Sequence, residues 1–192
     1  AYPIWIEKGE YHDESLSSAR AKDYPLLCMS NHGRWRFHAN LDDITWQREI
    51  ETMKIRGKDG YQYEPVWMHP QTAAKYGVAH GDIVKVYNER GTVLCGAYVT
   101  ERVVPQTVYV DHGSRFDPID AEKLDRGGAI NLISPHAIIS KNATGMVVSG
   151  YLVAIAKVTD EEMEGWKKEY PEAFARKVDE DCGVCLDGWL LS

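Results

Sequence analysis

Short apolar runs separated by turn residues dominate the middle of the chain. Strands are therefore expected at residues 26–29, 65–68, 83–87, 92–100, 107–110 and 150–158. Within 92–100, alternate positions define one apolar face, made of Val93, Cys95, Ala97 and Val99. Gly91 precedes this run, where a hairpin turn needs a positive φ. Several short strands with few helices favour a small closed β-barrel with long excursions.

Helical patterns are few. Residues 70–77 predict a short helix, because Pro70 suits the first helical position and Gly77 suits the C-terminal cap. Residues 42–56 give a weaker helical pattern. Residues 159–162 form a capping box, and an amphipathic helix follows with apolar positions at Met163, Trp166 and Tyr170 until Pro171. Phe174 extends that face onto a second turn.

These patterns divide the chain into three parts. Residues 1–23 are poorly periodic and are expected to be an incoming connection from an absent upstream domain. Residues 24–158 form the barrel, and residues 159–192 form a helical tail that docks on other parts of a parent protein. The long irregular stretch 111–149 is rich in Gly, Asn, Ser and His, so it is expected to be functional or partly helical.

The charge balance limits the kind of partner. The net charge of −7 over 192 residues argues against wholesale binding to nucleic acid or to an anionic membrane. The apolar runs are too short to span a bilayer. Residues 32–38 nevertheless carry two Arg, two His and no acid. A basic strip in an acidic chain indicates a discrete anionic ligand.

That strip belongs to the densest polar group in the sequence. If the segment is extended, alternate side chains point to opposite sides. One side then carries His32, Arg34, Arg36 and His38, and the other carries Gly33, Trp35 and Phe37. Such a row of donors suits phosphates and the edges of a heterocycle. The alternative is a solvated edge strand whose charges deter aggregation.

Two later loops carry further candidates. His112 and Gly113 follow a strand directly, a common place for binding residues. A hydrolase using Ser114 with a nearby His is disfavoured, because no GxSxG elbow accompanies it. In the second loop, the Gly pair 127–128 permits close backbone approach, and Asn131 offers both a donor and an acceptor. A simple turn is the other interpretation of that pair.

Metal binding and cysteine chemistry have weaker signals. The sequence has no HExxH motif and no compact group of ligands at metal spacing, so neither a metal ligand nor a catalytic residue is assigned. Cys28 and Cys95 lie in apolar runs and are expected to be buried. Cys182 and Cys185 form a lone CxxC, interpreted as two incidental thiols, with a disulfide or a shared metal as alternatives.

Taken together, the runs at 25–40 and 69–86, with Gly91, Val104-Pro105 and 128–131, resemble one family over residues 24–158. It is the C-terminal molybdopterin-dinucleotide-binding domain of the dimethyl sulfoxide reductase superfamily. Many members have Thr-Gly-Arg where this chain has Ser30-Asn31-His32, and Asp where it has Thr72. The tail at 166–174 is similar to the transhydroxylases that act on pyrogallol.

The resemblance implies a mainly β, six-stranded double-psi β-barrel with long loops, short helices and a C-terminal helical tail. It also implies a bis-(molybdopterin guanine dinucleotide) cofactor, whose molybdenum is held by the parent enzyme through an earlier domain. The residues implied to line this cofactor are Ser30, Asn31, His32, Arg34, Arg36, His38, His112, Gly113 and Asn131.

The function implied is that of a domain of a molybdenum oxidoreductase large subunit, inactive alone, from an enzyme acting on hydroxylated aromatics. Another molybdenum reductase or dehydrogenase, or a non-enzymatic barrel that binds proteins, is the alternative. The implied partners are the remaining domains of the same subunit and an iron–sulfur small subunit, in the cytoplasm.

Overall fold

The computed structural model describes residues 13–136, 138–140, 143–146 and 149–175. Six strands close a barrel, each hydrogen-bonded to the next around the ring. In ring order they are β1 (Leu26–Met29), β11 (Tyr151–Lys157), β4 (Ile83–Asn88), β5 (Gly91–Val99), β3 (Gln62–Met68) and β6 (Thr107–Val110). The mainly β, six-stranded barrel expected from the sequence is confirmed, with the strands within one to three residues of their predicted bounds.

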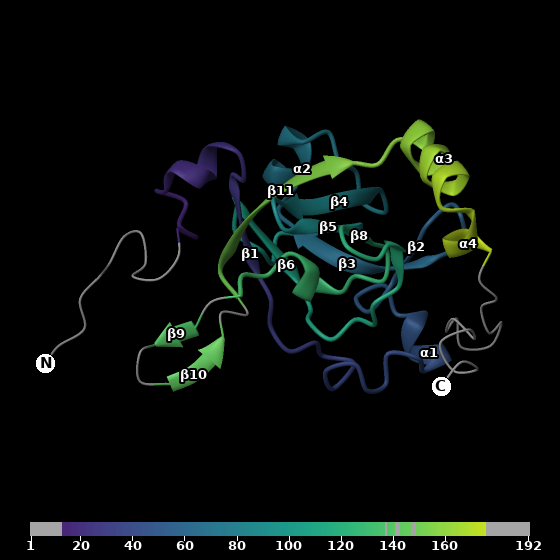
Figure 1. Ribbon diagram of the computed structural model, residues 1–192, viewed down its shortest axis with the longest axis horizontal. Coiled ribbons are helices and arrows are strands. Elements are labelled where there is room, and N and C mark those ends of the chain that lie inside the picture. The colour runs from purple at the N-terminus through teal and green to yellow at the C-terminus, as the bar shows by residue number, and fades with distance from the viewer. Residues whose placement is uncertain (1–12, 137, 141–142, 147–148, 176–192) are drawn as a thin grey trace, which may run out of the picture.

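Strand direction decides which loops meet. β1 runs parallel to β6, and β3 runs parallel to β5, while the other four ring contacts are antiparallel. The C-terminal ends of β1, β4 and β6 therefore lie at the same end of the barrel as the beginnings of β3, β5 and β11. We call this the lower end, as it lies in Figure 1.

The barrel interior is filled by β-branched and small apolar side chains. Fully buried members come from every strand of the ring, among them Leu26, Val66, Val84, Val93, Val108 and Val153. Cys28 and Cys95 are buried as predicted, and burial raises the pKa of the Cys28 thiol to about 12. Removing each such side chain from water contributes about 1.5–3 kcal/mol, so the barrel is a packed core.

The C-terminal helices cover one flank of the barrel, at the upper right of Figure 1. α3 (Asp160–Glu169) begins with the predicted capping box, in which Thr159 and Glu162 each accept the other's backbone N–H. Its apolar face and that of α4 (Pro171–Phe174) pack on this same chain, against Tyr63 and Leu94 of the barrel and against Ile119 and Leu124 of the excursion after β6. Residues 176–192, with Cys182 and Cys185, lie outside the described residues.

The first described residues also pack on the barrel. η1 (Ala19–Lys22) precedes β1, and the buried Glu14 accepts the backbone N–H of Leu152 at 2.6 Å. Glu14 also pairs with Arg20 and Arg90, at 2.8 and 3.0 Å. Part of the expected incoming connection is therefore bound to this chain's own barrel.

The excursions contain the remaining elements. These are α1 (Thr45–Arg48), β2 (Ile55–Arg56), α2 (Pro70–Lys75), β7 (Pro118–Asp120), β8 (Leu124–Asp125), η2 (Ile130–Leu132), β9 (Ile138–Ser140) and β10 (Ala143–Met146). The helix suggested at residues 42–56 is one turn only, because the segment then turns to bury Met53 and to pair β2 with β3. Among the described residues, no helix has the length and apolar character needed to cross a membrane.

Candidate functional site

The basic strip at residues 32–38 lies at the lower end of the barrel but is not a strand. Its backbone pairs only through isolated bridges, His32 with His112 and Phe37 with Asn40. His38 is in the left-handed region with φ 51°. The predicted row of four donors is therefore wrong: His32, Arg34 and His38 are exposed, whereas Arg36 is buried.

Arg36 points into the protein, where its donors are already bound. Its Nη1 donates to Glu64 (2.9 Å) and Asp42 (3.1 Å), and its Nη2 donates to Glu64 (2.7 Å). The same guanidinium donates to the carbonyl oxygens of Asp111 and His112. Burial favours the neutral guanidine, but the carboxylates of Glu64 and Asp42 outweigh it and raise the pKa of Arg36. Arg36 thus fixes the loop after β6 to the loop after β1.

Arg36 is one member of a buried charge network that the sequence analysis missed. Lys54 Nζ donates to Glu64 (2.9 Å) and Ser114 Oγ (3.0 Å) and lies 3.0 Å from Asp42. Arg48 donates to the Asp42 carbonyl oxygen at 2.7 Å. Burial raises the pKa of Asp42, but the cations of Lys54 and Arg36 outweigh it, so the pKa lies below the ordinary value. Each of these buried charges has a partner of opposite sign, which is what allows it to be buried.

Three imidazoles meet beside this network, and we call His32, His38 and His112 the histidine trio. One nitrogen atom of each lies within 4.8 Å of those of the other two, and His112 Nε2 is 3.1 Å from His38 Nδ1. The ring centroids are 4.4–5.0 Å apart. Burial and the neighbouring His32 and His38 lower the pKa of His112. Ligand spacing along the sequence does not reveal this group, because His112 is 74 residues from His38 along the chain.

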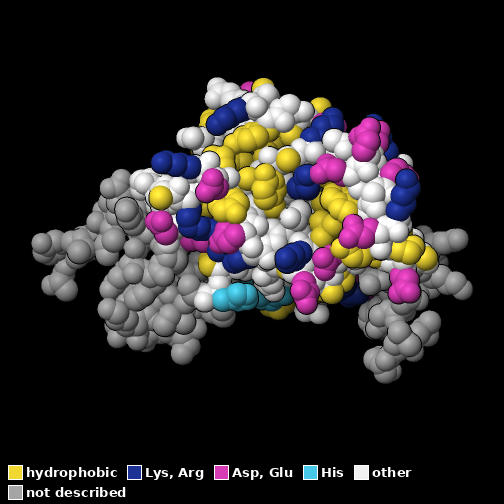
Figure 2. Space-filling model, turned by 45° about the horizontal axis from the view of Figure 1, so that its top comes forward, with side chains coloured by type: hydrophobic (Ala, Val, Ile, Leu, Met, Phe, Trp, Pro, Cys, Tyr) yellow, Lys and Arg dark blue, Asp and Glu magenta, His cyan; other side chains and the backbone are white. Residues whose placement is uncertain are grey.

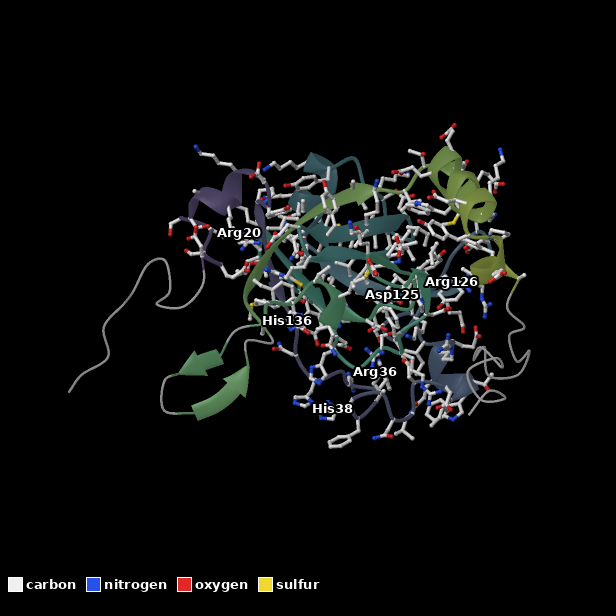
Figure 3. All side chains as sticks on the ribbon, viewed as in Figure 1. Arg20, Arg36, His38, Asp125, Arg126 and His136 are labelled. Carbon is white, nitrogen blue, oxygen red and sulfur yellow. The ribbon has the colours of Figure 1, made fainter. Side chains whose placement is uncertain are left out.

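The backbone holds the trio together through two close approaches. His112 N–H donates to the Asn31 carbonyl oxygen at 3.2 Å, beside the His32 bridge. Gly113 has φ 94°, and a Cβ there would lie closer than 3.0 Å to the backbone of His38. Only glycine permits both features at this position. In Figure 3 Arg36 and His38 lie together at the lower end of the barrel, and Figure 2 shows histidine side chains along the lower rim.

The backbone of the glycine pair at 127–128 lies directly against other parts of the protein. A Cβ on Gly127 would overlap the carbonyl oxygen of Arg115, and one on Gly128 would overlap the side chain of Glu64. The buried Asp125 carboxylate accepts the N–H groups of Gly128 and Ala129, both at 2.8 Å. Asn131, in η2, is exposed, and no hydrogen bond of its side chain is found among the described residues. Asn131 follows the loop between β8 and η2, and η2 packs on β5 at the lower end of the barrel.

Several polar groups at this end have no hydrogen-bond or ion-pair partner among the described residues, or are exposed. Ser30 Oγ is buried without a hydrogen-bond partner there. The exposed guanidinium of Arg34 lies over the Trp35 ring at 5.1 Å and forms no ion pair with a described residue. Asn31 is exposed as well. An orphaned hydroxyl, an unpaired cation and amide groups fit a ligand that has both phosphates and a polar heterocycle.

Ser114 does not fit a hydrolase. Its hydroxyl is buried, donates to the Gly127 carbonyl oxygen and accepts from Lys54, so it is engaged in the charge network. An activated serine would need a basic partner and access to substrate. The hydroxyl of Ser114 is therefore not available as a nucleophile in this arrangement.

Comparison with known proteins agrees with this geometry. The family described as "Molydopterin dinucleotide binding domain" matches residues 26–147. The "Dimethyl sulfoxide/trimethylamine N-oxide reductase" of Cereibacter sphaeroides is 33% identical over 148 residues, which are 76% of this chain and 16% of that protein. The "Pyrogallol hydroxytransferase large subunit" of Pelobacter acidigallici is 35% identical over 144 residues, which are 73% of this chain and 16% of that protein.

A solved structure has the same fold. The acetylene hydratase from Pelobacter acetylenicus superposes with a TM-score of 0.56 and 17% identity, over 77% of this chain and 21% of that one. The chain thus spans less than a fifth of the length of the curated relatives named above. The family match covers more than half of the chain and includes the loops that bring the histidine trio together. The chain belongs to the family of molybdopterin dinucleotide-binding domains.

Proposed function

We propose that the lower end of the barrel binds a bis-(molybdopterin guanine dinucleotide) cofactor within the large subunit of a molybdenum oxidoreductase. In this proposal the groups that contact the cofactor are exposed or half-buried at that end or, in the case of Ser30, buried without a described partner. They are Ser30, Asn31, His32, Arg34, His38, His112, Gly113 and Asn131. The cofactor supplies the redox chemistry, and the residues of this chain bind and orient it.

One observation carries the proposal. Two loops that are about eighty residues apart in sequence meet at the His32–His112 bridge, and they leave donors free on the outer side. Arg36 has its donors bound inside the protein, so we assign it a positioning role. It keeps the two loops in the arrangement that the cofactor needs.

The finer assignment concerns the reaction. We infer a pyrogallol hydroxytransferase-like enzyme acting on hydroxylated aromatics, supported by the 35% identity to that enzyme's large subunit. The 33% identity to the dimethyl sulfoxide/trimethylamine N-oxide reductase supports a reductase to a similar degree, which makes that the second candidate. The other domains of the same subunit, an iron–sulfur small subunit and a cytoplasmic location belong to the same proposal. An assay of the parent enzyme with pyrogallol and with trimethylamine N-oxide separates the two reactions.

Cofactor binding is tested on the purified chain with added molybdopterin guanine dinucleotide, measured by fluorescence of the oxidised pterin. Loss of a charge-assisted hydrogen bond costs about 1.5–3 kcal/mol. Arg34→Leu should therefore weaken binding roughly 10- to 100-fold, and Asn131→Ala roughly 5-fold for about 1 kcal/mol.

The controls are Arg102→Leu and Gln71→Ala. Both residues are exposed in loops or helices at the opposite end of the barrel, after β5 and β3. Both should leave binding unchanged. Equal retention of the pterin by Arg34→Leu and Arg102→Leu would refute the placement of the cofactor.

A further inference from the structure

The histidine trio has the composition of a metal site. We propose that His32, His38 and His112 bind one first-row divalent transition-metal ion, of the class of Zn²⁺, when the chain holds no dinucleotide cofactor. The inference rests on the geometry of the trio and does not depend on the proposed function.

The distances between the imidazole nitrogen atoms are close to those between the ligands of a zinc ion. Zn–N bonds of about 2.0–2.1 Å in a tetrahedral site place two ligand nitrogens about 3.4 Å apart. His112 Nε2 and His38 Nδ1 are already 3.1 Å apart. All three nitrogens lie within 4.8 Å of one another. The side chain of His32 is exposed, so its ring can rotate toward the other two nitrogen atoms when an ion binds.

The backbone beneath the trio is fixed before any ion arrives. The bridge between His32 and His112 sets two of the ligands side by side. Gly113 lets the backbone of His38 approach, and Arg36 holds the carbonyl oxygen of His112 from inside the protein. Ion binding therefore orders three imidazole rings and little else, which keeps its entropic cost small.

The donor set selects the class of ion. Three imidazole nitrogens without a carboxylate suit Zn²⁺, Co²⁺, Ni²⁺ and Cu²⁺, whereas Mg²⁺ and Ca²⁺ require oxygen ligands. Three protein ligands also leave one coordination position for water or for another ligand. The buried guanidinium of Arg36 is paired with Glu64 and Asp42, which offset part of its charge.

The test is equilibrium dialysis of the purified, cofactor-free chain against Zn²⁺, with zinc measured by elemental analysis. The chain carries the replacements Cys182→Ser and Cys185→Ser, because a CxxC pair can bind zinc by itself. We expect one zinc ion per chain, and a visible absorption band when Co²⁺ replaces Zn²⁺. The ion should be lost in His38→Gln and in His112→Gln, and excess Mg²⁺ should not displace it.

Two controls separate ligand loss from unfolding. His80→Gln removes an exposed imidazole that pairs with Glu51 at 2.7 Å, and it should leave zinc binding unchanged. His32→Gln alters an exposed side chain, so it should keep the circular dichroism and melting temperature of the metal-free chain while losing the ion. No zinc in the chain that lacks Cys182 and Cys185, or zinc that survives replacement of the trio, would overturn the proposal.

A last variant distinguishes this inference from the proposed function. Arg34→Leu should weaken binding of the dinucleotide and leave zinc binding intact, since Arg34 is outside the trio. If the trio fails to bind zinc, the dinucleotide measurement is unaffected. If Arg34→Leu retains the dinucleotide, the zinc measurement is equally unaffected.

Discussion

Arg36 and Glu64 form a bidentate ion pair inside the lower end of the barrel, although 28 residues separate them along the chain. Their side chains are 2% and 1% exposed. The pair joins the loop after β1 to strand β3, and the same guanidinium binds two carbonyl oxygens of the loop after β6. Two loops that carry candidate cofactor residues, and the strand between them, thus share one buried contact.

The first prediction follows from this burial. Arg36→Met removes the fork and leaves Glu64 with Lys54, which it shares with Asp42, while Asp42 keeps Arg48 at 3.8 Å. Removing one partner of a buried ion pair costs about 3–5 kcal/mol, because a buried carboxylate then loses its direct partner. The free energy of unfolding, from urea titration at pH 7, should fall by that amount. Arg34→Met, at an exposed neighbour, should change it by less than about 0.5 kcal/mol. Equal stability of the two variants would contradict the assigned role of the pair.

The second prediction concerns pH. The cations around Asp42 lower its pKa in the folded chain, against the effect of burial, relative to about 3.9 in the unfolded chain. A lowered pKa means that the stabilisation by the Asp42 carboxylate is fully present above about pH 4 and is lost as pH falls through the folded-state pKa. Asp42→Asn should therefore cost about 3 kcal/mol or more at pH 7. The difference from the wild type should narrow below pH 4.

Asp43 is the matched control for that pH series. It pairs with Arg115 at 3.3 Å, but both side chains are 34% exposed. An exposed pair contributes about 0–1 kcal/mol, so Asp43→Asn should have a small effect at every pH. A pH-independent loss in Asp42→Asn would show that the carboxylate acts through its shape rather than its charge.

The barrel was predictable because its signals are local. Each strand carries its own apolar run and its own turn residues, and Thr107–Val110 needs no distant partner to be recognised. The capping box at Thr159 and Glu162 is equally local. Such elements can be predicted from one stretch of sequence. The closed ring then follows, because the strands bury their apolar faces together.

The site was less predictable because its determinants are not local. Alternation along residues 32–38 assumes an extended backbone, but the backbone bends at Arg34 and Trp35 and is left-handed at His38, so the period is lost. Arg36 points inward because its guanidinium binds the buried carboxylate of Glu64. The sequence near Arg36 does not indicate that this carboxylate is its partner. His112 likewise joins His32 through a parallel bridge between distant segments. The residue types were informative, whereas their directions depended on contacts across the fold.

The third prediction tests Gly113, whose backbone lies against that of His38 and so brings His38 close to His112. Gly113→Ala meets two costs, the positive φ of 94° and the overlap of its Cβ with the backbone of His38. The left-handed conformation alone costs a residue with a side chain roughly 1–2 kcal/mol. The overlap with backbone atoms cannot be relieved by a side-chain rotation, so the loop after β6 must move away from His38. The total loss in free energy of unfolding should exceed about 3 kcal/mol.

Gly60→Ala separates these two costs. Gly60 has a φ of 84°, close to that of Gly113, but a Cβ there would meet nothing within 4 Å. Its replacement should therefore cost only the backbone strain, roughly 1–2 kcal/mol, and should leave dinucleotide retention unchanged. The excess loss in Gly113→Ala measures how tightly the lower-end loops are held against each other. If the two alanine variants were equally stable and retained the cofactor equally, the close approach between Gly113 and His38 would have no part in forming the site.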